Sequence, residues 1–160
     1  MALLRERICK HPVLILAVLI LIVTAFIFSN SLKNSEASHQ DSDVILGWVQ
    51  PLLEKLFGEC AVDWSYWVRK TAHITEFCTL GILVFWLIAV LKRHLYGYGF
   101  FYVLAVAVLD EFIQSFTGRT SQILDVLIDF AGALLGFGIV LFVTKVKQKI
   151  SSRSALRSVE

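Results

Sequence analysis

Four long apolar runs constrain this chain more than any other feature of its sequence. They cover residues 12–29, 71–91, 97–116 and 124–144. Each approaches the roughly 20 residues that an α-helix needs to cross the hydrocarbon core of a bilayer, and each exceeds the usual helix of a soluble domain. Hydrophobic residues make up 57% of the sequence, and the mean hydropathy of +0.72 is well above that of an ordinary soluble domain. The sequence therefore predicts one all-α membrane domain over residues 1–160, a polytopic bundle of four transmembrane helices.

The first run has an alternative interpretation as a secretory signal peptide. Arg5, Arg7 and Lys10 precede it, and Ser29 and Ser31 resemble the small residues of a cleavage site. The run is long for a signal peptide, however, and three further runs of similar length follow it. We therefore interpret it as the first membrane span.

Basic residues predict the direction in which the spans cross the membrane. They form clusters before the first span, between the second and third spans, and after the fourth span. The members are Arg5, Arg7, Lys10, Lys92, Arg93, Lys145, Lys147, Lys149, Arg153 and Arg157. If the four spans cross the membrane in alternating directions, all three clusters lie on the same side. The positive-inside rule makes this side cytoplasmic. We expect a multi-pass protein with both termini in the cytoplasm.

The segment between the first and second spans, residues 30–70, is then expected on the outer side. The stretch SNSLKNSEASHQDSD (residues 29–43) has no hydrophobic periodicity and predicts a loop. The following DVILGWVQPLLEKLFGE (residues 43–59) carries apolar residues at helical spacing. This pattern predicts an amphipathic helix that lies on the membrane surface or caps the bundle. Pro51 interrupts the pattern and could divide the helix into two short pieces.

Ionisable residues lie inside three of the apolar runs, and their depths agree. At a rise of ~1.5 Å per residue, Glu76 lies about 9 Å, Asp110 and Glu111 about 8–9 Å, and Asp129 about 10 Å below the outer surface. His73 lies just below that surface. The inner halves of the spans are apolar apart from flanking tyrosines. Because the span boundaries do not depend on this agreement, it indicates that the ionisable groups meet at one level near the outer side.

The spacing of these residues also places them on one face of each helix. Side chains three or four residues apart are neighbours on a helix surface. The residues with this spacing are Arg69, His73 and Glu76 in the second span, Asp110, Glu111 and Gln114 in the third, and Asp125 and Asp129 in the fourth. Charged groups within a membrane face the bundle interior or a wet cavity. The three faces therefore predict one outward-opening polar pocket, with Lys70 and Arg119 at its rim.

The same charges also have structural interpretations. Arg69, Lys70 and Asp125 are shallow enough for their side chains to extend to the membrane surface. The deeper carboxylates could pair with basic residues and only link the helices together.

Small residues predict where the spans approach each other closely. Gly132 and Gly136 have the GxxxG spacing that allows close helix packing in the fourth span. Gly81 could serve the same purpose in the second span.

Several chemistries suit the predicted pocket. His73 could act as a general base that Glu76 orients. Arg69, Lys70 and Arg119 could hold a phosphate or carboxylate head group. One histidine with several carboxylates could also hold a hard divalent cation, although the sequence does not require a metal cofactor. The residues indicate a site without selecting one reaction.

Other functional classes find little support in the sequence. Cys9, Cys60 and Cys78 share no metal-like spacing, and we expect no disulfide framework. The basic residues lie mostly at the two ends of the chain, and no glycine-rich phosphate loop is present, so nucleic acid is not an expected partner.

The stretches WVRKTAHITEFCTLGIL and LDEFIQSFTGRTSQILDVLIDFAGALLG resemble the VanZ-like family of small bacterial membrane proteins. The serine-rich FSNSLKNSEASHQ is similar to the outer loop of this family, and the resemblance covers most of residues 26–140. Phe77 stands where the family often has tyrosine. The resemblance implies a multi-pass protein of the bacterial cell membrane.

The resemblance also implies functional roles for the residues that match the family pattern. We predict catalytic roles for His73, Glu76, Asp110, Glu111 and Asp129, and ligand-binding roles for Arg69, Lys70, Gln114, Arg119 and Asp125.

The family takes its name from a protein linked to resistance to the glycopeptide teicoplanin, which implies a cell-envelope context. An enzyme acting on an envelope lipid or lipid-linked precursor is the first hypothesis. A protein that binds or transports an amphiphile or cation is the second, and a structural membrane scaffold is the third. The sequence does not determine the oligomeric state.

Overall fold

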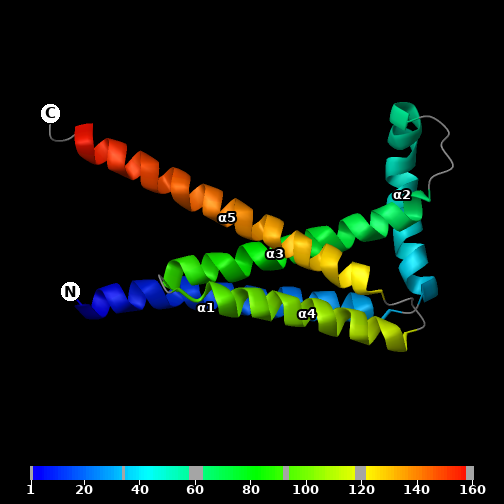
Figure 1. The fold of residues 1–160 in the computed structure, drawn as a ribbon, viewed down its shortest axis with the longest axis horizontal. Coiled ribbons are helices and arrows are strands. Elements are labelled where there is room, and N and C mark those ends of the chain that lie inside the picture. The colour runs from blue at the N-terminus through cyan, green and yellow to red at the C-terminus, as the bar shows by residue number, and fades with distance from the viewer. Residues whose placement is uncertain (1, 34, 58–62, 92–93, 118–121, 158–160) are drawn as a thin grey trace.

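The computed structural model describes residues 2–33, 35–57, 63–91, 94–117 and 122–157. These residues form five α-helices and no strand (Figure 1). The helices are α1 (Ala2–Ser31), α2 (Ser35–Phe57), α3 (Trp64–Leu91), α4 (Tyr96–Phe116) and α5 (Ile123–Arg157). The predicted all-α fold is therefore confirmed.

Four of the described helices are long and apolar enough to cross a membrane. The apolar stretches are His11–Ser31, Trp64–Leu91, Tyr96–Phe116 and Ile123–Ser152. The predicted number of spans is confirmed, and each helix extends beyond its predicted apolar run. α5 continues far into the basic tail, because lysine, arginine and glutamine are themselves good helix formers.

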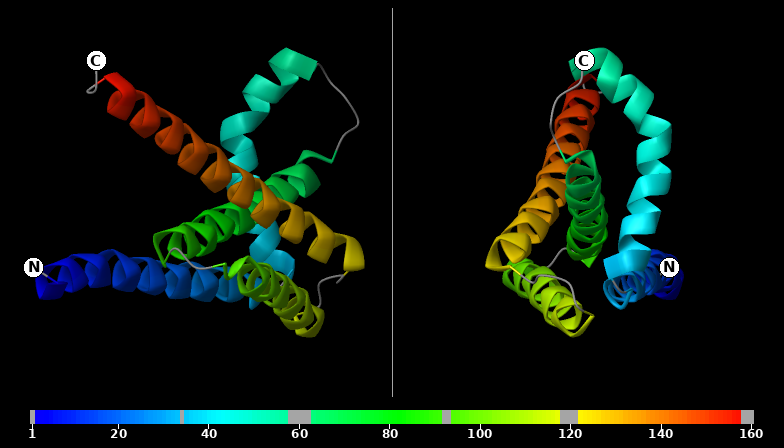
Figure 2. Two further views of the ribbon diagram at one scale, coloured as in Figure 1. Left: turned by 60° about the vertical axis from the view of Figure 1, so that its left-hand side comes forward. Right: turned by 90° about the vertical axis from the view of Figure 1, so that its right-hand side faces the viewer.

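The N- and C-termini lie at the same end of the molecule, and α2 crosses the opposite end at a steep angle to the other helices (Figures 1 and 2). The central helix is α3, which packs against α1, α2, α4 and α5. The predicted position of the amphipathic segment across one end of the bundle agrees with this arrangement.

The loop predicted for residues 29–43 is wrong for most of that stretch. α1 continues to Ser31 and α2 begins at Ser35, so helices cover most of the stretch and a turn begins at Leu32. In this turn the amide of Leu32 donates to the carbonyl of Phe28 at 3.0 Å. A helix that faces water on most of its sides needs no apolar stripe, so missing periodicity does not exclude a helix.

The predicted division of this segment at Pro51 is also wrong. Pro51 lies inside α2, and the helix continues to Phe57. Proline removes one backbone hydrogen bond from a helix interior. Because Pro51 is exposed, water can reach the carbonyl that loses its partner.

Glycines allow α3 and α5 to cross at very short range. A Cβ atom on Gly81 would lie 2.4 Å from the carbonyl oxygen of Ala133, and one on Gly136 would lie 2.3 Å from the carbonyl oxygen of Cys78. Gly132 faces the backbone of α3 in the same way, at 2.7 Å. The predicted role of these glycines in close helix packing is confirmed.

This crossing also positions polar residues of the two helices. The backbone of Ile74 is the neighbour of Gly132 across the interface. His73 directly precedes Ile74 in α3, and Asp129 lies about one turn before Gly132 in α5. The close approach of the two backbones therefore brings the histidine and the carboxylate to the same place.

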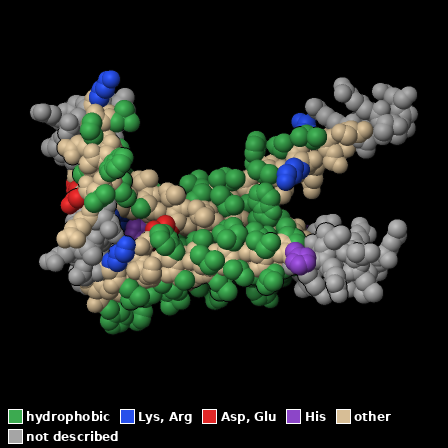
Figure 3. All heavy atoms as spheres, turned by 180° about the vertical axis from the view of Figure 1, so that it is seen from behind, with side chains coloured by type: hydrophobic (Ala, Val, Ile, Leu, Met, Phe, Trp, Pro, Cys, Tyr) green, Lys and Arg blue, Asp and Glu red, His purple; other side chains and the backbone are tan. Residues whose placement is uncertain are grey.

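The bundle has an apolar interior and an apolar exterior. Phe77 and Leu80 are fully buried in the core, whereas Leu14, Phe101 and Phe142 are each more than half exposed. On the face shown in Figure 3, hydrophobic side chains cover the middle of the bundle and charged side chains lie toward its ends. Soluble proteins rarely expose apolar surface so extensively, whereas such a surface suits lipid chains.

Candidate functional site

Buried polar side chains gather at the end of the bundle that α2 crosses. Ser31, Asp110, Glu111, Gln114 and Asp129 are each at most 4% exposed. They come from α1, α4 and α5, which are separate in sequence. A carboxylate leaves water at a high cost in free energy unless hydrogen bonds or opposite charges replace its hydration. The partners of these groups therefore determine what the cluster can do.

His73, Asp110 and Asp129 meet at the centre of this polar cluster. The Nδ1 atom of His73 lies 3.9 Å from Oδ2 of Asp110 and 3.8 Å from Oδ1 of Asp129. The three side chains come from α3, α4 and α5. An imidazole between two carboxylates can be held in one orientation and can exchange a proton with a bound molecule. The sequence predicted that these three residues share one pocket, and the structure places them together.

Asp110 is fixed by hydrogen bonds from two other helix positions. The hydroxyl of Ser31 donates to Oδ1, and Nε2 of Gln114 donates to Oδ2 at 2.7 Å. Gln114 also lies within 3.5 Å of the Ser31 hydroxyl. Gln114 was a predicted ligand-binding residue, and in the structure it positions a carboxylate.

Glu76 and Glu111 lie at the edges of the cluster. Nδ2 of Asn30 donates to Oε1 of Glu76 at 2.8 Å, which joins α1 to α3. The backbone amide of Gln122 donates to Oε2 of Glu111 at 3.2 Å, which joins α4 to the start of α5. Both carboxylates therefore accept hydrogen bonds that join helices.

The predicted basic rim divides into separate parts. Lys70 forms a salt bridge with Asp125, and both side chains are 15% exposed. This pair joins α3 to α5. Arg69 lines a neighbouring cavity, and Arg119 lies outside the described residues.

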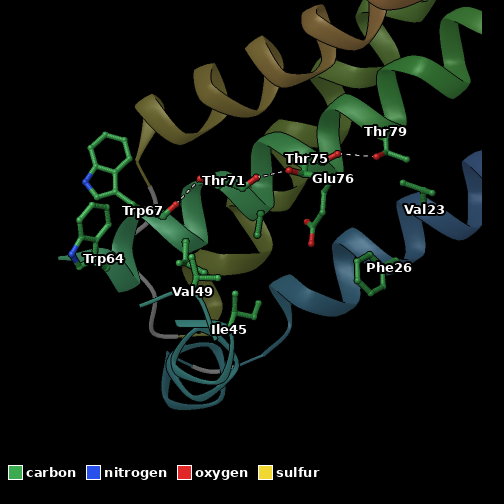
Figure 4. Close-up of a pocket in the computed structure, with 12 residues that line it drawn as sticks. Val23, Phe26, Ile45, Val49, Trp64, Trp67, Thr71, Thr75, Glu76 and Thr79 are labelled. Carbon is green, nitrogen blue, oxygen red and sulfur yellow. Dashed lines mark hydrogen bonds between the residues drawn. The ribbon is translucent and has the colours of Figure 1, made fainter. Parts of the chain in front are cut away.

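A groove of about 670 Å³ runs between α1, α2 and α3. It is lined by Val23, Phe26, Ile45, Val49, Trp64, Trp67, Val68, Thr71, Ala72, Thr75, Glu76 and Thr79 (Figure 4). We call this the apolar groove. The hydroxyls of Thr71, Thr75 and Thr79 donate to carbonyls of their own helix at 2.8–2.9 Å, as the dashed lines in Figure 4 show. Since these hydroxyls are occupied, the surface that α3 offers here suits a hydrocarbon chain.

A second cavity of about 430 Å³ adjoins the apolar groove. The two share five lining residues, among them Glu76. The second cavity adds Asn30, Lys33, Ser42 and Arg69 to its lining. We call it the polar cavity. The apolar groove thus leads to a cavity with two cationic side chains and a carboxylate. This combination matches an amphiphile, which has an apolar chain and a polar head.

Sequence reasoning missed Lys33 in the wall of the polar cavity, and it also missed Asn30 and Ser31. Both lie in the polar stretch after the first apolar run, which was interpreted as a loop. In the structure they form the last turn of α1, with Asn30 facing Glu76 and Ser31 facing Asp110. If the helix of the first apolar run is extended by one turn, it includes both residues, and this extension could have identified them.

The four apolar helices and the ionisable groups buried among them define a polytopic helical membrane protein. The sequence model of the VanZ/LLP1 family matches residues 13–144 of the chain. The protein belongs to this family, so the resemblance noted in the sequence is confirmed. No curated protein and no solved structure matches the chain.

Proposed function

We propose that this protein binds an amphiphilic lipid of the cell envelope, or a lipid-linked precursor, and acts on its polar head. The observation that carries the proposal is the continuity of the apolar groove with the polar cavity, which share Glu76. A hydrocarbon chain fits the groove, and an anionic head fits the cavity beside Lys33 and Arg69. Both volumes lie within the roughly 300–1,000 Å³ of typical ligand sites.

The last turn of α1 connects this binding region with the buried carboxylates. Asn30 contacts Glu76 at the wall of the polar cavity, and the next residue, Ser31, contacts Asp110. His73 lies one helical turn from Glu76 on α3. We assign the chemical step on the head group to His73, with Asp110 and Asp129 beside it.

Arg69 and Lys33 are assigned to recognition of the head group. Guanidinium and ammonium groups both bind phosphate, and the guanidinium does so with two parallel hydrogen bonds. Lys70 and Asp125 form a salt bridge between α3 and α5. Their role in the proposal is to hold α3 and α5 together beside the site.

The proposal includes an orientation in the cell membrane. With both termini in the cytoplasm, the polar cavity opens in the outer half of the membrane, where lipid-linked cell-wall precursors are exposed. Glycopeptides such as teicoplanin bind these precursors. A change in the amount or form of such a precursor would therefore link the protein to glycopeptide susceptibility, which can be compared in cells with and without the gene.

A panel of envelope lipids offered to the purified protein tests the proposal. Wild type, His73→Ala and Arg69→Ala are compared for bound lipid and for chemical change of the lipid by mass spectrometry. We expect wild type to bind and convert one class of lipid, His73→Ala to bind without conversion, and Arg69→Ala to bind more weakly. Binding without conversion by wild type would favour a binding or transport function, and absence of binding would contradict the proposal.

A further inference from the structure

We infer that His73, Asp110 and Asp129 form a binding site for a divalent transition-metal ion. One ring nitrogen of His73 and one oxygen from each aspartate all lie within 4.8 Å of one another. Two atoms that each bind one ion at about 2.0–2.6 Å are at most about 4–5 Å apart. The three atoms therefore fit around a single ion with little movement of the side chains.

The separations within this group fit metal ligands better than direct hydrogen bonds. The imidazole nitrogen is 3.9 Å and 3.8 Å from the two carboxylate oxygens. Hydrogen bonds between nitrogen and oxygen usually span about 2.7–3.2 Å. A central ion would occupy the space that these distances leave.

Asp129 supplies an independent observation. Its side chain is only 2% exposed, and its Oδ2 atom has no hydrogen-bond partner among the described residues. Among the described residues no lysine or arginine lies within salt-bridge distance of it, whereas Asp125, one turn earlier in α5, forms a salt bridge with Lys70. A buried carboxylate oxygen without a partner is costly, and a bound cation removes that cost.

Asp110 is held in the way that metal-binding carboxylates usually are. Ser31 donates to one oxygen and Gln114 to the other. Each carboxylate oxygen retains a further lone pair for an ion. Hydrogen bonds from outside the ligand set fix the orientation of ligands in many metal sites.

The ligand types select the class of ion. Imidazole nitrogen binds Zn²⁺ and other transition metals, whereas Ca²⁺ and Mg²⁺ prefer oxygen ligands alone. Three protein ligands also leave a coordination position open for water or a bound molecule, as in catalytic zinc sites. Zn²⁺ is therefore the probe of choice.

A titration of the full-length protein tests this site. Purified protein in detergent is stripped with EDTA and titrated with Zn²⁺ in competition with a coloured chelator. We expect one tightly bound ion per chain, weakened at least about a hundredfold in His73→Ala and Asp129→Asn, since even loss of a residue that supports a ligand costs about 10–100-fold. His94→Ala and Asp43→Asn are matched controls with exposed side chains, and both should bind as wild type does.

Folding and metal binding are separated by a third variant and by heat. Gln114→Ala retains all three ligands and should weaken binding about 10–100-fold. Zn²⁺ should raise the Tm of wild type but not that of Asp129→Asn. The inference is overturned if wild type retains no Zn²⁺, if the ligand variants bind as the controls do, or if equimolar Mg²⁺ or Ca²⁺ displaces Zn²⁺. No lipid is added in this titration, so absence of Zn²⁺ binding would not contradict the proposed lipid binding. Absence of lipid binding would likewise not contradict the metal site.

Discussion

Buried hydrogen bonds fix the position of the Asp110 carboxylate. Ser31 is fully buried, and its hydroxyl donates to Asp110. Oδ2 of Asp110 in turn lies near His73 and accepts a hydrogen bond from Gln114. A small hydroxyl at the end of α1 thus positions a charged group of α4 within the site.

Replacement of this hydroxyl should therefore destabilise the protein. We expect Ser31→Ala to lower the free energy of unfolding by about 1–2 kcal/mol, because Asp110 loses a donor that water cannot readily replace. Thermal unfolding in detergent measures the change. Ser29→Ala is the matched control, since the exposed Ser29 hydroxyl donates to the carbonyl of Phe26 in its own helix. Equal stability of the two variants would contradict a specific contribution of the Ser31–Asp110 hydrogen bond to the free energy of unfolding.

At the residue scale, the sequence predicted the residues of the site more successfully than it predicted the contacts that each of them makes. The common depth of Asp110 and Asp129 followed from counting residues within each span. His73 was expected nearer the surface, and in the structure it lies beside both carboxylates. The separate pairing of Lys70 with Asp125 did not follow, because it depends on how far α3 and α5 are rotated about their axes. Helix rotation is a property of packing, which periodicity does not report.

At the scale of helices, the contact between α3 and α5 organises the bundle. Glycines on both helices lie against the backbone of the partner. In a membrane such close approach provides packing energy that lipid-facing leucines cannot provide. This crossing also brings His73 and Asp129 together, so the site depends on it.

A methyl group at the crossing should separate these helices. Gly136→Ala places a Cβ atom 2.3 Å from the carbonyl oxygen of Cys78, and we expect a loss of about 1–3 kcal/mol in stability. Gly138→Ala is the control on the same helix, because a Cβ atom there has no neighbour within 4 Å. Its stability should be unchanged or slightly higher. The two variants are compared by thermal unfolding, and equal effects would contradict the close packing.

The sequence predicted the membrane helices more reliably than α2. A run of about 20 apolar residues has few alternatives to a spanning helix. The first half of α2 is polar and has no stripe, so nothing in its pattern distinguished it from a loop. Helix formation there depends on neighbours that a local pattern does not contain.

At the scale of the whole molecule, both termini lie at one end and α2 lies across the other (Figure 1). The positions of the basic clusters predict that the terminal end is cytoplasmic. Reporter fusions test this orientation. A fusion after residue 94 should report the cytoplasm, and one after residue 119 should report the outside. The opposite result would place the polar cavity on the cytoplasmic side and reject an envelope ligand exposed outside.

The apolar groove was not predicted from the sequence. It arises because α2 crosses the end of the bundle and leaves space beside α1 and α3, with residues from all three helices in its wall. No local pattern encodes that crossing angle. The groove is nevertheless the feature on which the proposed function depends most.

Native mass spectrometry of bound envelope lipid tests this central claim most directly. Thr75→Trp fills the apolar groove, whereas Val108→Trp adds the same side chain to the half-exposed face of α4, away from the groove. We predict that wild type and Val108→Trp retain the same lipid with equal affinity. Thr75→Trp should bind it at least about tenfold more weakly, a loss of about 1.4 kcal/mol. Equal lipid binding by all three proteins would contradict the account.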